Sequence, residues 1–215
     1  MLDVHAPHES MHGWRDFFLH LTTITIGLLI ALSLEGLVEW QHRRHLVHDA
    51  EASLHAEIKG NAGNIDSVLA DLHKRQASLK HDVYVLNYIA ANGKYPEEKN
   101  MEVNFQIVAF ESVAWKTAQS TGALSYMPYD LAQDYSSIYM QQDLVTGAEQ
   151  QAARDSVLAI GPFINEPSDS PPPSREQAQS IVEKIEVLQG QLILVDSFMQ
   201  GLSGGYKQFL SAHPN

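Results

Sequence analysis

The hydrophobic pattern of the chain is dominated by residues 17–34, which read FFLHLTTITIGLLIALSL and carry no formal charge. As a helix this run is about 27 Å long, close to the hydrocarbon thickness of a bilayer. Trp14 and Trp40 flank it, and the helix between them spans about 39 Å, which places both indoles where they are preferred, at the two lipid–water interfaces. We therefore expect a transmembrane helix over residues 17–40, with Trp14 and Trp40 as interfacial anchors.

Two other interpretations of this run stay open. A helix wholly buried in a soluble protein has a similar composition, although neither neighbouring segment offers an all-apolar partner. A cleaved signal peptide is the second, because Ala31-Leu32-Ser33 resembles a small-x-small cleavage site. The region before the run has one arginine, Arg15, which is cancelled by Asp16. We therefore prefer an uncleaved anchor.

Small residues recur every four positions within the run, at Thr23, Gly27 and Ala31. Such a stripe lets helix backbones approach closely in lipid, so we expect it to contact another transmembrane helix, either a second copy or a subunit of a membrane complex. The alternative is that the stripe faces lipid. His20 and Glu35 lie near the same stripe, at depths from which both side chains reach the interface.

The helix is expected to continue past the membrane, because no proline occurs between Trp40 and Asn92. Gly60 and Gly63 predict a kink or break, and Asn92-Gly93 predicts the end of the helix. Beyond the glycines, positions with alternating three- and four-residue spacing form the seam of a packed helix. This seam consists of Ala62, Ile65, Leu69, Leu72, Gln76, Leu79, Val83, Leu86 and Ala90.

Three further helices are predicted. The first covers Val103–Gln119 and stops at Thr121-Gly122, and the second starts at Pro128 and runs to about Ile160, with Leu131, Tyr135, Ile138 and Val145 on one face. A proline-rich linker, residues 161–173, precedes the last helix, which begins with a capping box, Ser174-x-x-Gln177. The seam of that helix is Ile181, Ile185, Leu188, Leu192, Val195, Met199, Leu202, Tyr206 and Phe209.

These elements predict an all-α fold: one N-terminal transmembrane helix that continues into an antiparallel bundle of about four helices. Residues 1–16 form a polar, histidine-rich tail, and residues 41–215 form the extramembrane bundle.

Charge and composition exclude some classes of partner and of chemistry. With 26 acidic and 14 basic residues the net charge is −12, so we expect no nucleic-acid partner. The absence of cysteine excludes disulfides and thiolate chemistry and leaves the compartment open.

Candidate chemistry is sparse. His8-Glu9-Ser10-Met11-His12 matches the H-E-x-x-H string of zinc peptidases, but it lies in a short tail without a third ligand or walls, so a metal held by His5, His8 and His12 is only a weak alternative. His42, His45 and His48 recur beside two arginines, which favours a solvated or headgroup-facing surface. Gly201-Leu202-Ser203-Gly204-Gly205 matches the G-x-S-x-G string of serine hydrolases, yet it lies in a helical seam rather than a strand-to-helix turn.

Two segments, ITIGLLIALSLEGLVEW and SVAWKTAQSTGALSYMPYDLAQDY, resemble a group of uncharacterised bacterial single-pass membrane proteins in which an N-terminal anchor precedes a helical domain. The resemblance implies the inner membrane and a periplasmic domain. The distribution of arginines, with Arg15 before the span and Arg43 and Arg44 after it, leans instead toward a cytoplasmic domain.

The function expected from these features is that of a non-enzymatic, membrane-anchored interaction or scaffold protein without a cofactor. One form of this role is an accessory subunit of a larger membrane complex. Its partners would be the bilayer and another transmembrane helix. The alternative is a sensory or ligand-binding bundle whose pocket is lined by Tyr126, Tyr129, Tyr135 and Tyr139. A metal-dependent enzyme built on the His8-Glu9-x-x-His12 string is the most distant alternative.

Overall fold

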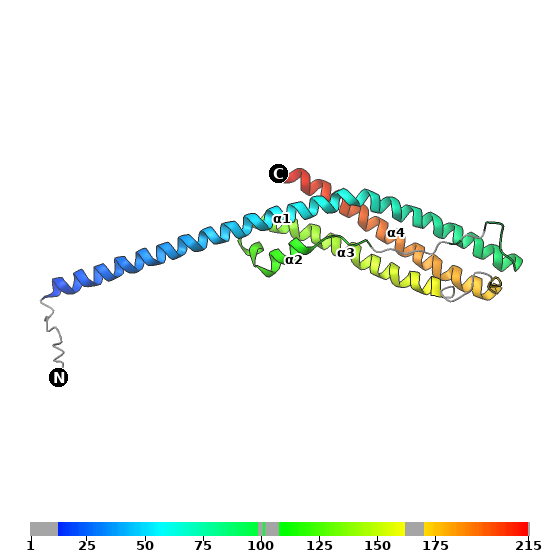
Figure 1. Cartoon of the computed structure of the whole chain (residues 1–215), viewed down its shortest axis with the longest axis horizontal. Helices are drawn as coiled ribbons and strands as arrows, with labels where there is room; N and C mark the ends of the chain where they lie inside the picture. Colours follow the sequence, from blue (N-terminus) through cyan, green and yellow to red (C-terminus); the bar gives the residue numbers. More distant parts are fainter. Residues whose placement is uncertain (1–12, 99–100, 102–107, 162–169, 215) are drawn as a thin grey trace, which may run out of the picture. The chain divides into compact units, whose positions relative to one another are not determined.

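The computed structural model describes residues 13–98, 101, 108–161 and 170–214. Four α-helices and one short 3₁₀ helix account for most of this part of the chain, in which no strand occurs (Figure 1). The elements are α1 (Trp14–Asn92), α2 (Val113–Ser120), η1 (Ala123–Tyr126), α3 (Tyr129–Ile160) and α4 (Arg175–Ala212). The prediction of an all-α fold with a long apolar N-terminal helix is confirmed.

The chain divides into two compact units, Met1–Asp49 and Ala50–Asn215. In the first unit α1 carries the apolar run, and its most apolar 18-residue window has a mean hydropathy of 2.1, with none of the window buried. Among the described residues, α1 is the one helix long and apolar enough to cross a membrane. We call residues 14–40 of this helix the apolar arm.

Helix ends follow the local signals in the sequence. Gly93 and Gly122 adopt left-handed backbone angles, with φ of 65° and 74°, a region that glycine enters without steric cost. Pro128 occupies the N-cap position of α3. At the start of α4 the Ser174 hydroxyl accepts a hydrogen bond from the Gln177 backbone, and the Gln177 side chain accepts one from the Ser174 backbone. The predicted capping box is therefore present.

Of the kink or break predicted at Gly60 and Gly63, the break is absent, because helix α1 continues through both glycines. Another local prediction is wrong. Residues 108–112, which were expected to belong to a helix over 103–119, are not helical, and α2 begins only at Val113. Three backbone groups of this segment pair with side chains of α1 and α3 rather than within a helix, namely the N–H of Val108 and both the N–H and the carbonyl of Glu111.

The core of the second unit is built by the later part of α1, by α3 and by α4. All nine seam residues predicted on α4 are buried. On α1 the seam is buried at alternate positions, Ile65, Leu72, Leu79 and Leu86, whereas the other five positions are half-buried. Leu54 and Ile58 extend the buried face of α1 to residues before the predicted seam.

Hydrogen bonds between the helices define their register. Between α1 and α4, His55 Nε2 lies 2.9 Å from the His213 carbonyl oxygen at the end of α4, and Gln76 Nε2 donates to the Leu192 carbonyl at 3.2 Å. Residue numbers therefore rise along α1 as they fall along α4. The same holds between α3 and α4, where His213 pairs with Asp134 and Gln142 pairs with Tyr206.

Candidate functional site

The apolar arm satisfies its own polar side chains. The hydroxyls of Thr23, Thr25 and Ser33 each donate a hydrogen bond to the backbone carbonyl four residues earlier, at 2.9, 2.8 and 2.6 Å. In water these hydroxyls have solvent partners, whereas in hydrocarbon they have only the backbone of their own helix. The arrangement therefore suits an apolar surrounding.

The small-residue stripe of the arm is open. Thr23, Gly27 and Ala31 are exposed, and apart from its chain neighbours and the backbone of its own helix turns nothing in the described part of the chain lies within 4 Å of a Cβ placed on Gly27. A neighbouring helix can therefore approach the backbone at Gly27 without displacing any described part of this chain.

The two tryptophans differ in their surroundings. Trp14 is 76% exposed and lies against Phe17 and Phe18, with ring centroids 6.2 and 5.1 Å away. The Arg44 guanidinium lies over the ring of Trp40, 5.5 Å from its centroid, in a cation–π contact. Arg43, beside it, is paired with Glu39. An indole followed one helical turn later by a cationic side chain is typical of a helix that crosses a lipid–water interface.

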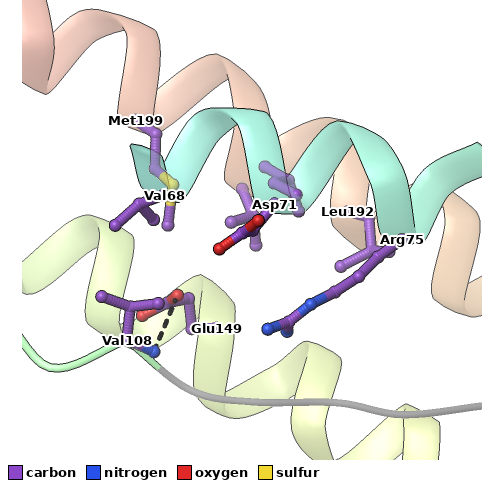
Figure 2. A pocket seen from close by; sticks show the side chains of 9 residues that line it. Val68, Asp71, Arg75, Val108, Glu149, Leu192 and Met199 are labelled. Carbon is purple, nitrogen blue, oxygen red and sulfur yellow. Dashed lines mark hydrogen bonds between the residues drawn. The ribbon is translucent and has the colours of Figure 1, made fainter. Parts of the chain in front are cut away.

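A second candidate site lies inside the second unit, around Glu149 of α3. A cavity of about 10 Å³ is lined by Val68, Asp71, Leu72, Arg75, Val108, Glu149, Leu192, Val195 and Met199 (Figure 2). Such a volume corresponds to one water molecule and lies far below the several hundred cubic ångströms of an organic ligand pocket. The site can therefore hold a single water molecule but not an organic ligand.

Glu149 is 3% exposed and only half satisfied. Its Oε1 accepts a hydrogen bond of 3.4 Å from the Val108 backbone, whereas Oε2 has no hydrogen-bond partner in the described part of the chain. Burial raises the pKa of this carboxyl to about 7, against the opposing effects of the Val108 hydrogen bond and the positive charge of Arg75. Glu149 therefore changes its charge near neutral pH.

Residues 108–112, which we call the strap, are held by polar side chains of α1. The Asn61 amide pairs with the backbone of Glu111 on both sides, donating to its carbonyl at 2.8 Å and accepting from its N–H at 3.0 Å. Just beyond the strap, Glu57 Oε2 accepts from the Ala114 N–H at 2.8 Å, in the first turn of α2. A carboxylate is favourable there because a helix N-terminus has unpaired N–H groups and a partial positive charge.

Aromatic residues complete this polar cluster. The Tyr139 hydroxyl donates to Glu57 Oε1 at 2.6 Å, and its ring stacks on Trp115 with centroids 4.7 Å apart. Gln142 donates to the Tyr206 hydroxyl at 2.7 Å. Burial first, and then the neighbouring Glu57, raises the pKa of Tyr139, and burial also raises that of Tyr206, so both phenols stay protonated at any physiological pH.

The histidine strings of the sequence do not form a metal site in the described part of the chain, where no group of three metal-binding side chains is found. His5, His8, Glu9 and His12 lie outside the described residues. His42, His45 and His48 are exposed, and His48 Nδ1 lies 3.5 Å from Asp49 Oδ1. The G-x-S-x-G string lies within helix α4, with Ser203 buried.

The four tyrosines singled out in the sequence separate into two pairs. Tyr126 and Tyr129 are exposed, whereas Tyr135 and Tyr139 are buried in ring contacts, with Phe209 and Trp115 respectively. Burial and then the Glu51 charge raise the pKa of Tyr135 to about 12. The tyrosines do not line the Glu149 cavity.

Sequence reasoning missed the polar residues that organise the second site, which are Glu57, Asn61, Gln142 and Glu149. A signal was present, because Asn61 continues the spacing of Leu54, Ile58 and Ile65, and Glu149 lies four residues after Val145 and three before Ala152. Polar residues in phase with a buried face require partners.

Comparison of the chain with protein-family models, with curated proteins and with solved structures finds no match.

Proposed function

We propose that the chain is a non-enzymatic, single-pass protein of the bacterial inner membrane that acts as a scaffold or an accessory subunit of a larger membrane complex. Residues 17–40 cross the bilayer, and residues 41–215 form an antiparallel helical bundle on one side of it. The observation that carries this proposal is the fully exposed apolar window of the arm. Exposing large side chains such as Leu28, Ile30 and Leu32 to water is unfavourable by about 25 cal/mol per Å² of apolar surface, whereas lipid removes this penalty.

The same exposure favours an anchor over the core helix of a soluble protein, which is mostly buried. The Glu149 cavity is too small for an organic ligand, so this cavity does not support the ligand-binding alternative.

Membrane attachment is tested by fractionation of cells that express the full chain, followed by extraction at alkaline pH. An integral protein stays in the pellet and is released only by detergent. Recovery of the intact chain in the soluble fraction would end the proposal. Recovery of a chain that starts after Ser33 would favour the signal-peptide alternative.

The side of the bundle is decided by labelling, for which the chain is well suited because it has no cysteine. A Ser180→Cys variant places one thiol at an exposed position of α4. Reaction with a membrane-impermeant maleimide in intact spheroplasts places the bundle in the periplasm, as the resemblance implies. Reaction only after lysis places it in the cytoplasm, as the arginine distribution implies.

The partner in the membrane is proposed to be another transmembrane helix that packs on Thr23, Gly27 and Ala31. The open backbone at Gly27 supports this proposal. A Gly27→Ile substitution fills the stripe, and we expect it to abolish cross-linking to the partner helix in membranes. Gly36 is the matched control, because nine residues at 100° place it on the opposite side of the arm and it too has open space around it. Equal effects of Gly27→Ile and Gly36→Ile would overturn the assignment of this stripe.

A further inference from the structure

The position of Glu149 is unusual for a carboxyl group. The side chain is 3% exposed and lines a cavity of single-water size, and its Oε2 has no hydrogen-bond partner among the described residues. A buried anion needs a partner for each oxygen, and one half-satisfied carboxylate destabilises the closed structure. The neutral, protonated acid has no such requirement for charge compensation.

The groups that face Glu149 come from every element around it. From α1, the Asp71 carboxylate and the Arg75 guanidinium extend toward the side of α3 where Glu149 lies, as Figure 2 shows. The positive charge of Arg75 lowers the pKa of Glu149, whereas Asp71 is paired with Lys74 at 3.1 Å. From α4 the cavity receives only apolar side chains, Leu192, Val195 and Met199. No lining residue other than Arg75 compensates a negative charge on Glu149.

The remaining neighbour of Glu149 is the strap. Its first residue, Val108, lines the cavity and donates its backbone N–H to Glu149 Oε1 across 3.4 Å, at the long end for such a bond. At its other end the strap is held by Asn61, through two hydrogen bonds that involve no titratable group. The strap therefore has one anchor that depends on pH and one that does not.

We propose that Glu149 is a proton-controlled clasp for the strap: while the carboxyl is protonated the strap stays closed with Val108 over α3, and when the carboxyl ionises the burial of a charge outweighs the Val108 hydrogen bond and favours opening of the strap, which admits water to the cavity. Opening hydrates the carboxylate and supplies a partner for Oε2. Since the closed site raises the pKa of Glu149 from 4.5 to about 7, ionisation must favour whichever state leaves the carboxyl better hydrated. The bundle thereby responds to proton concentration between mildly acidic and mildly alkaline pH.

Hydrogen exchange of the strap amides tests this proposal, with the full chain in detergent micelles or nanodiscs at pH 5.5 and pH 8. After correction for intrinsic exchange, the linkage relation gives an opening constant about 30-fold larger at pH 8 if Glu149 has an ordinary pKa in the open state. We expect Glu149→Gln to remove this pH response, because an amide does not titrate. We expect Asn61→Ala to raise exchange at both pH values by similar factors, because its anchor is neutral.

A wild-type strap whose corrected exchange is the same at both pH values would overturn the proposal. So would a Glu149→Gln variant that keeps the full pH response. A direct measurement covers the case in which the Glu149→Gln variant does not fold: ¹³C titration of the Glu149 carboxyl in the wild-type chain. An apparent pKa near that of a free glutamate, about 4.3, contradicts the clasp, whereas one near neutrality supports it.

Discussion

Glu57 of α1 and Tyr139 of α3 are 82 residues apart in the chain and are joined by a buried hydrogen bond of 2.6 Å. The bond leaves Glu57 Oε2 free to accept the Ala114 N–H, so one carboxyl connects α1, α2 and α3. Trp115, which follows Ala114 in α2, stacks on the ring of Tyr139. The position of α2 against the bundle thus depends on this pair.

Removing the Tyr139 hydroxyl tests the contribution of the pair. A Tyr139→Phe variant keeps the ring that stacks on Trp115 and leaves Glu57 Oε1 without its donor, so we expect a loss of about 1–3 kcal/mol in the free energy of unfolding. Denaturant unfolding measures it. The matched control is Tyr129→Phe, because Tyr129 is 79% exposed. Equal midpoints for the two variants would contradict the role given to the hydrogen bond.

The pH dependence of stability has a defined sign at Glu149. Its folded pKa is raised from 4.5 to about 7, so its contribution to stability is fully present below pH 4.5 and is lost as the pH rises through 7. The loss amounts to about 3 kcal/mol, at 1.36 kcal/mol per pKa unit. We expect Glu149→Gln to be more stable than the wild type at pH 8 and to show little of this dependence. Glu183→Gln, at an exposed position of α4, removes the same charge and should leave the pH profile unchanged.

The contribution of the capping box at the start of α4 to the free energy of unfolding can be measured separately. Ser174→Ala removes the hydroxyl that accepts from the Gln177 N–H at 3.2 Å, and we expect a loss of about 1 kcal/mol in the free energy of unfolding. Hydrogen exchange in the first turn of α4 should increase by a similar free energy. Ser180→Ala, in the helix interior and exposed, provides the comparison. A larger loss for Ser180→Ala would show that the capping box does not stabilise α4.

Most helix boundaries and the α4 core could be predicted from the sequence because their causes are local. The seam from Ile181 to Phe209 follows from helical spacing alone, and all of it is buried. Gly93 and Gly122 end their helices because glycine enters the left-handed region without strain. The capping box needs only residues three positions apart.

The polar cluster could not be predicted in this way, because its partners are distant in sequence. Asn61 reads as one polar residue in an apolar face until the backbone of Glu111 lies opposite it. The error over residues 103–119 has the same origin, since the strap is kept out of a helix by hydrogen bonds to Asn61 and Glu149. The spacing of Glu149 from Val145 and Ala152 indicates that it is buried, but the residues around it come from three helices and the strap, which no local pattern contains.

The exposed apolar arm leads to a prediction about whether lipid or water surrounds it. Ile26, near the middle of the arm, and Ile193, on α4, are both exposed, by 52% and 66%. If the arm crosses a bilayer, Ile26→Arg places a cation at membrane depth, which disfavours insertion by about 2.5–3.5 kcal/mol, whereas Ile193→Arg extends into water.

We therefore expect the fraction of chain that resists alkaline extraction to fall strongly for Ile26→Arg and to stay at the wild-type level for Ile193→Arg. The two substitutions are matched in chemistry and in exposure, so a general loss of folding would affect both. If both variants remain in the membrane pellet to the same extent as the wild type, Ile26 does not lie at membrane depth and the arm has another partner. If Ile26→Arg alone is lost, lipid is the surrounding that the exposed leucines and isoleucines of the arm require.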